Sequence, residues 1–338
     1  MRASTAVLTD TSIRLWDLAF PRDEVIVCRT RAAYVALDSL IAFNKKDRDG
    51  KVDAYLAAYL PEEVVLLFFL GGDLVNAAML TPDGRVPIGF GEALRRIHAE
   101  SERGEIAFHQ GAPDLLAAMH ASCVRPPLPV QLDPRTPETV FKTLFEQRWS
   151  GLLELISNGR VNYLTVQDGR FASGHFCGRR PDEQPLSYVA RLFSSVPPEP
   201  LPTVSAKVYE TPPPLPHQAP PAMVAMFRHY VWDLTDLIEG EAPGEGAKRA
   251  ERVRQRLLSK HQVLGCVGGP RDAAPADPVV EPRALAEGVA AWTRELLAEV
   301  EVLAPQSAPR LVRLSGREHR FALTAVGFFE QLPWRVQW

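Results

Sequence analysis

The sequence predicts an α+β protein in which two small strand-rich modules are followed by an α-helical C-terminal domain. Alternating apolar runs separated by glycine turns fill the first part of the chain, and apolar residues at helical spacing fill the last part. Prolines cluster between these parts, where packed elements end because proline lacks an amide proton. We therefore place the modules at 1–125 and 138–195, a Pro-rich linker at 196–221 and the helical domain at 222–338.

The first module combines short strands with tight turns and two helices. Gly71-Gly72-Asp73 and Thr81-Pro82-Asp83-Gly84 supply turn chemistry between apolar runs. The predicted strands are 24–28, 51–59, 63–70, 74–80 and 104–108, and the predicted helices are 90–98 and 113–121.

The second module repeats this pattern on a smaller scale. Asn158-Gly159 lies between alternating apolar runs and predicts a hairpin, because both residues tolerate the positive φ of a type I′ turn. Asp168-Gly169 provides the next turn. The predicted strands are 152–156, 161–166 and 171–177, and the predicted helices are 137–148 and 186–193.

The shared order of strand, turn, strand and helix has two explanations. Gly72-Asp73 in the first module holds the place of Asp168-Gly169-Arg170 in the second, and Leu94 to Ile97 matches Ala190 to Phe193. These correspondences fit a tandem duplication. Two unrelated α+β units that share a common order by chance would give the same pattern.

The second module also carries a helix, a Ser-Gly step, an apolar hairpin and an Asp-Gly-Arg turn. The residues are Leu144-Phe145, Arg148, Ser150-Gly151, Leu153, Leu155, Asp168-Gly169-Arg170 and Ala172. This pattern resembles the small N-terminal domain of PatA-type response regulators, and the resemblance is clearest over 137–195. Residues 24–121 share it only through the repeat, with Gly-Gly-Asp where Asp-Gly-Arg is expected.

The resemblance implies an interaction module in a bacterial signalling protein, because the PatA-type domain occurs in bacterial multidomain signalling proteins and has no enzymatic activity known for it. The sequence shows no receiver domain, since it lacks an acidic cluster followed by a strand-end aspartate and a lysine in a doubly wound pattern. A phosphoacceptor role is therefore not implied.

The last domain has the period of amphipathic helices. Its apolar residues recur every three or four positions and then continue into an apolar, aromatic tail. Among them are Met223, Phe227, Tyr230, Leu234, Ile238, Val253, Leu257, Val289, Trp292, Leu296 and Val300.

Composition narrows the setting and the partners. The formal net charge of −3 gives no global attraction to nucleic acid or anionic lipid. The four cysteines are scattered without a CxxC pair, as in reduced cytosolic proteins. The N-terminus does not resemble a secretory signal, and the longest apolar run, 64–70, falls short of the roughly 20 residues of a spanning helix. We expect a cytoplasmic protein without a membrane partner.

The motifs that resemble chemical sites are all incomplete. A calcium loop around Asn44 to Gly50 would have Lys45 and Leu56 at positions one and twelve, where carboxylates are needed. His175 with Cys177 gives two ligands where zinc usually takes four. Gly265 to Pro270 lacks the ending of a phosphate loop and is interpreted as a flexible loop. We predict no catalytic, cofactor-binding or metal-binding residues and no cofactor. An unrecognised hydrolase, with His98 or His229 beside a nucleophile, is kept as an alternative.

Two groups of residues are candidates for interaction. Arg249, Arg252, Arg256 and Lys260 form a basic helix face, which either binds an acidic partner or nucleic acid or is a solvated outer face. Trp334 and Trp338 in the tail either anchor a partner or pack on their own domain. The leading hypothesis is a non-enzymatic bacterial signalling or scaffold protein that binds protein partners, a second copy included. The alternative is a nucleic-acid-associated protein.

Overall fold

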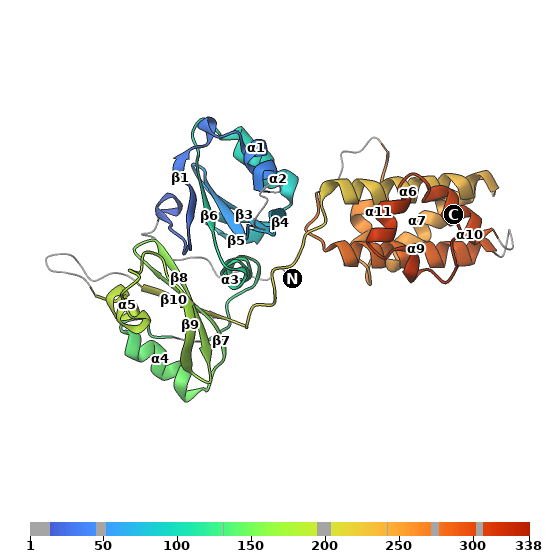
Figure 1. Cartoon of the computed structure of the whole chain (residues 1–338). Helices are drawn as coiled ribbons and strands as arrows, with labels where there is room; N and C mark the ends of the chain where they lie inside the picture. Colours follow the sequence, from blue (N-terminus) through green and yellow to red (C-terminus); the bar gives the residue numbers. More distant parts are fainter. Residues whose placement is uncertain are drawn as a thin grey trace. The chain divides into compact units, whose positions relative to one another are not determined.

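The computed structural model describes residues 14–44, 52–130, 132–194, 204–241, 243–271, 277–301 and 307–338. The chain forms two compact units, which are described separately (Figure 1). The strand-rich unit comprises 1–88 and 92–216, and the helical unit comprises 89–91 and 217–338. Most of the charged turn considered as a calcium loop, residues 45–50, lies outside the described residues.

The elements up to residue 216 alternate strands and short helices. In chain order they are η1 (Leu15–Asp17), β1 (Val25–Arg31), η2 (Ala32–Tyr34), α1 (Leu37–Asn44), β2 (Ala54–Tyr59), β3 (Val64–Leu70), β4 (Asp73–Thr81), β5 (Gly84–Pro87), α2 (Phe90–Ala99), β6 (Glu105–Gln110), α3 (Pro113–Val124), α4 (Pro137–Glu146), β7 (Gly151–Ser157), β8 (Arg160–Gln167), β9 (Arg170–His175), α5 (Pro185–Leu192) and β10 (Val204–Tyr209).

The remaining elements are helical. They are α6 (Pro221–Glu241), α7 (Gly246–Leu257), α8 (Leu264–Val267), α9 (Pro282–Glu301), α10 (Ala308–Ser315), α11 (Arg320–Ala325) and η3 (Phe329–Gln331). The α+β class with a helical C-terminal region, predicted from the change of apolar period, is confirmed. None of the described helices is long and apolar enough to cross a membrane.

Two antiparallel sheets build the strand-rich unit. Within the described residues, one sheet has six strands in the order β1-β6-β2-β3-β4-β5, and the other has four in the order β10-β7-β8-β9. Helix α3 lies between them, as Figure 1 shows, and its apolar residues share one core with a face of each sheet. The opposite face of the four-stranded sheet packs against α4 and α5.

The two sheets contain the same four-stranded arrangement. The order β6-β2-β3-β4 in the larger sheet corresponds to β10-β7-β8-β9 in the smaller one, with every neighbouring pair antiparallel. In chain order, a helix precedes the first strand of each set, α1 before β2 and α4 before β7. Another helix precedes the last strand, α2 before β6 and α5 before β10. This is the arrangement that a tandem duplication predicts, and the larger sheet adds β1 at one edge and β5 at the other.

Turn chemistry explains where the hairpins of the smaller sheet reverse. Asn158 and Gly159, between β7 and β8, have φ of 51° and 75°. Asp168 and Gly169, between β8 and β9, have φ of 48° and 75°. Positive φ at both central residues is the type I′ geometry that matches the twist of paired strands. Both predicted turns are confirmed.

The range predicted as a Pro-rich linker contains a strand, which corrects that prediction. Val204 to Tyr209 forms β10 and pairs along its whole length with β7. The prolines of 196–221 lie outside the paired residues 204–209. The edge of a sheet tolerates a strand that is bounded by proline. Residues 204–209 therefore complete the second sheet, so the second module extends beyond 195.

Three shorter elements also differ from prediction. The helix α1 and the strand β5 were not predicted from the sequence. Residues 264–267 form the single helical turn α8, in a stretch where 265–270 was predicted to be a loop. Each element is short, so its periodicity is weak evidence.

A buried ion pair connects the two sheets of the strand-rich unit. Arg85 on β5 donates two hydrogen bonds to the Glu154 carboxylate on β7, at 2.6 Å and 3.1 Å. The Arg85 side chain is 9% exposed and that of Glu154 only 1%. Arg85 also donates to the Ser122 hydroxyl on α3, which lies 3.0 Å from the Tyr163 hydroxyl. Each charge is thus desolvated and depends on the other.

Two buried histidines in this unit have lowered pKa values. Burial, assisted by the charge of Arg22, lowers the pKa of His109 to about 4. Burial, assisted by the charge of Arg125, lowers the pKa of His120 to about 4. The His109 Nδ1 and His120 Nε2 atoms have no hydrogen-bond partner within the described residues. The fold therefore holds both rings neutral.

We expect the melting temperature to fall as the pH is lowered from about 6.5 towards 4. The unfolded chain binds protons at these histidines with a pKa near 6.5, whereas the folded protein takes them up only near 4. The stabilisation is complete above about 6.5 and is lost as the pH falls. Thermal unfolding followed by circular dichroism should show a shallower decrease between these pH values for His109→Phe/His120→Phe. An unchanged slope would contradict the neutral, buried state.

One continuous core holds the helical unit together. It draws fully buried side chains from the long helices and from the short C-terminal ones, among them Phe227, Tyr230, Leu234, Val289, Trp292, Leu296, Leu311 and Phe328. Their spacing of three to four along α6 and α9 is the amphipathic period that the sequence predicts.

Candidate interaction surface

Two of the four basic residues predicted to form a helix face, Arg252 and Arg256, are neutralised by acidic residues of α9. Arg252 lies 3.2 Å from the Glu299 carboxylate, and Arg256 lies 2.6 Å from Glu295 and 3.1 Å from Glu299. Arg249 pairs within its own helical region, 3.4 Å from Glu245. The helix therefore resembles a solvated, ion-paired outer face more than an open cationic surface.

Lys260 does not share the helix with the three arginines. Helix α7 ends at Leu257, so Lys260 lies in the turn that follows. Among the described residues it is exposed and forms no ion pair. The four predicted cations consequently do not form one helix face.

The two tail tryptophans differ in exposure. Trp334 is partly buried and packs against the helical core, as a structural residue does. Trp338 is 41% exposed, and its ring meets Phe329 edge to face at 5.2 Å. The Arg320 guanidinium lies 5.0 Å from the centre of the Trp338 ring. Of the two candidates, only Trp338 presents a large part of its ring to solvent.

Helix α11 adds an exposed aromatic residue beside Trp338. Phe321 is 85% exposed, and the Arg320 guanidinium lies 5.5 Å from its ring centre. Arg320 thus lies within reach of two aromatic rings, both partly in water, where an arginine can hold an aromatic surface by cation–π attraction. Sequence reasoning missed Phe321 as a surface residue. Leu323, two residues later, is buried, and residues two apart do not share a helix face.

Two stacked histidines join α6 to the residue that precedes Arg320. The rings of His229 and His319 are 5.9 Å apart and inclined by 26°, and His229 lies 5.5 Å from the Trp232 ring. Trp232 also borders a hollow of about 130 Å³. We call the set the aromatic strip: Trp232, His229, His319, Arg320, Phe321 and Trp338.

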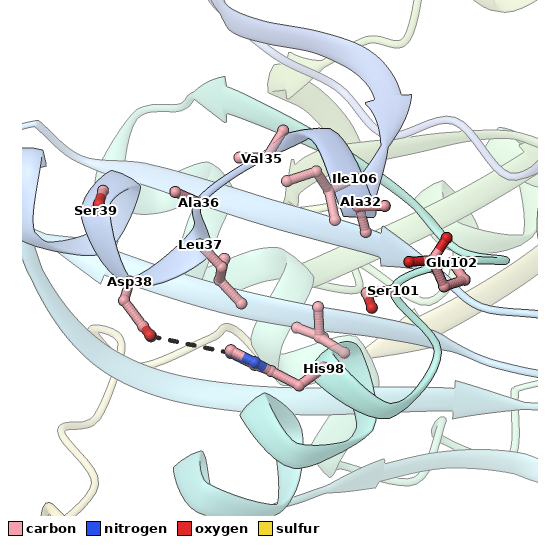
Figure 2. Close-up of a pocket in the computed structure, with 12 residues that line it drawn as sticks. Ala32, Val35, Ala36, Leu37, Asp38, Ser39, His98, Ser101, Glu102 and Ile106 are labelled. Carbon is pink, nitrogen blue, oxygen red and sulfur yellow. Dashed lines mark ion pairs between the residues drawn. The ribbon is translucent and has the colours of Figure 1, made fainter.

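In the strand-rich unit, a surface depression of about 390 Å³ lies beside α1 and α2 (Figure 2). Figure 2 shows His98 and Asp38 pointing toward one another across it, with Nε2 and Oδ1 3.9 Å apart. That distance is beyond hydrogen-bond range, and the side chains are 48% and 85% exposed. This geometry is that of a surface ion pair.

The depression gives the hydrolase alternative little support. Ser39 and Ser101 both line it, but within the described residues no hydrogen bond joins either hydroxyl to the His98 ring. A serine nucleophile needs such a bond to its base. His229, the other histidine considered, lies against the rings of His319 and Trp232.

Comparison with protein-family models, with curated proteins and with solved structures finds no match. The resemblance of 137–195 to the PatA-type domain, and the duplication at 24–121, therefore stay predictions. Besides the residues that suggested these predictions, the two sheets share one strand order.

The His175 and Cys177 pair is used structurally. The His175 ring lies 3.1 Å from the Asp114 carboxylate on α3. The Cys177 backbone amide donates to the Asn162 side chain, and burial raises the pKa of the Cys177 thiol, which disfavours the thiolate that binds metals. Among the described residues no three or more histidine, cysteine or acidic side chains gather as metal ligands would.

Proposed function

We propose that the chain is a non-enzymatic signalling or scaffold protein of a bacterium, which binds a protein partner through the aromatic strip. The observation that carries the proposal is the exposed Phe321 beside Arg320 and Trp338. Tryptophan, tyrosine and arginine dominate the energetic centres of protein interfaces, and a ring this exposed gains most from being covered.

The hollow beside Trp232 supports a protein ligand. At about 130 Å³ it has room for one side chain of a partner, next to a ring that can pack over it. Interface hot spots typically pair an aromatic anchor with such a pocket. The signalling part of the proposal rests on the resemblance at 137–195 and is independent of this surface.

The nucleic-acid alternative has weaker support. Arg252 and Arg256, which it needs for phosphate contacts, are already paired with Glu295 and Glu299. A phosphate would have to displace these carboxylates, which lowers the gain from counterion release.

We expect Phe321→Ser to weaken partner binding by roughly tenfold or more, because losing a hot-spot aromatic costs about 2 kcal/mol or more. A photoreactive phenylalanine analogue at position 321 would first crosslink the partner in a native bacterial lysate. The affinity of the purified partner for both proteins would then be measured by isothermal titration calorimetry.

The matched control is Tyr34→Ser, which removes an aromatic ring that is 80% exposed in the strand-rich unit. We expect this control to bind like the unmodified protein. Equal affinity for the Phe321→Ser variant, or no crosslinked protein at position 321, would refute the role of the aromatic strip.

A further inference from the structure

The two sheets differ at equivalent edges. In the six-stranded sheet, the outer edge of β4 is covered by β5, which pairs with it antiparallel over 78–81. Strand β9 holds the place of β4 in the smaller sheet, and among the described residues β8 is its only strand partner. Within the part of the chain that the structure describes, the same position is thus paired in one module and unpaired in the other.

The open edge of β9 consists mainly of small residues and contains one bulge, at Ala172. Its central residues Ala172, Ser173 and Gly174 are small and contain no proline or lysine, the residues that natural proteins place on edges to block further strands. Ala172 and Ser173 are exposed. Phe145, which is 52% exposed, lies at the end of α4 next to the turn that opens β9.

Residues of opposite charge lie near the two ends of β9. Arg170, at its start, is exposed and forms no ion pair within the described residues. His175, at its end, is joined to Asp114, whose side chain is 72% exposed. One end of the strand therefore carries Arg170, which lies 5.7 Å from the centre of the Phe145 ring and has no carboxylate partner among the described residues. An accessible carboxylate, Asp114 of α3, lies beside the other end.

The register places the strand positions of Arg170 and His175 on the same face of the sheet, while the Arg170 guanidinium lies near the Phe145 ring of α4. Arg170 is paired with Gln167 of β8, and His175 is paired with Tyr163. Directly opposed residues share a face, and Gln167 and Tyr163 are four residues apart on one strand, so they share a face too. The register shift between Thr165 and Val166 brings this about, since it leaves Ala172 as an extra residue in β9.

We propose that the outer edge of β9 is a self-association surface, on which β9 of a second copy pairs antiparallel to extend the sheet. A two-fold axis through the middle of β9 brings opposite ends of the two strands together. Arg170 of each copy then meets Asp114 of the other, beside His175, so the contact forms twice. Main-chain hydrogen bonds supply affinity, and these charge pairs fix direction and register.

A charge-reversal cycle tests this arrangement. Sedimentation velocity from micromolar to millimolar protein should show a monomer–dimer equilibrium. Arg170→Glu should weaken the dimer by roughly tenfold or more, because like charges then face each other across the axis. Arg170→Glu/Asp114→Arg should restore it to within severalfold of the unmodified protein. Arg180→Glu, which removes an exposed cation outside β9, is the matched control and should leave the dimer unchanged.

Hydrogen exchange locates the contact and keeps the test decisive if Asp114→Arg disturbs the fold. Exchange of the β9 amides should slow as the protein concentration rises, and should stay fast in Arg170→Glu. A monomer at every concentration, equal effects of Arg170→Glu and Arg180→Glu, or a dimer whose β9 amides exchange at an unchanged rate would overturn the proposal. None of these outcomes bears on the aromatic strip, because β9 lies in the other unit.

Discussion

Replacing Glu154 by alanine is expected to lower the free energy of unfolding of the strand-rich unit by about 3 to 5 kcal/mol. The substitution leaves the Arg85 guanidinium, whose side chain is 9% exposed, without the carboxylate that accepts two of its hydrogen bonds. An unpaired buried charge keeps its full desolvation cost, and the remaining partners are a neutral hydroxyl and a carbonyl oxygen of Ser122.

Urea unfolding followed by circular dichroism measures this loss, and hydrogen exchange of β5 and β7 assigns it to the contact between the sheets. The control is Arg85→Met/Glu154→Leu, which removes both charges while keeping apolar volume. We expect this double variant to lose less stability than Glu154→Ala, because no unpaired charge is left behind. A loss below about 1 kcal/mol for Glu154→Ala would mean that water reaches the pair.

Most strands were predictable because their signals are local. Asn158-Gly159 and Asp168-Gly169 have the backbone freedom that a type I′ turn requires, and both reverse the chain where predicted. The apolar run 64–70 is long enough for one buried strand and forms β3. Local sequence therefore determined where these hairpins begin and end.

Strand β10 was missed although its alternation is present. Val204 and Val208 face the core against α4 and α5, with Ala206 packed against it. The surrounding prolines suggested a linker, because proline is rarely found inside a strand. What decides the structure is the free edge of β7, some 50 residues earlier in the chain, which accepts β10 along its whole length. Such a long-range pairing has no signal in a local window.

The surroundings of the candidate interaction residues were also hard to predict, because they depend on contacts between distant parts of the sequence. The sequence shows the cations of α7, but their partners Glu295 and Glu299 belong to α9, about 40 residues later. Only packing of the two helices brings them together. The sequence places the apolar residues Phe321 and Leu323 two positions apart on α11, and only packing shows that Leu323 is buried and Phe321 exposed.

Replacing Trp292 by alanine is expected to lower the free energy of unfolding of the helical unit by about 3 to 5 kcal/mol. Trp292 on α9 is 1% exposed and lies within the continuous core. Its ring nitrogen donates a hydrogen bond of 3.0 Å to the Ala250 carbonyl oxygen on α7, so the substitution removes both a large apolar volume and a link between helices.

Urea unfolding of Trp292→Ala, with hydrogen exchange of α7 and α9, measures the effect. Trp292→Phe is the matched control, because it keeps most of the apolar contact and removes the hydrogen bond; its loss should be roughly 1 to 3 kcal/mol. If α7 packed only against the surface of α9, both variants would lose little of their free energy of unfolding. The difference between the two losses therefore separates the packing of the ring from the hydrogen bond to Ala250, and shows which of them holds α7 on the core.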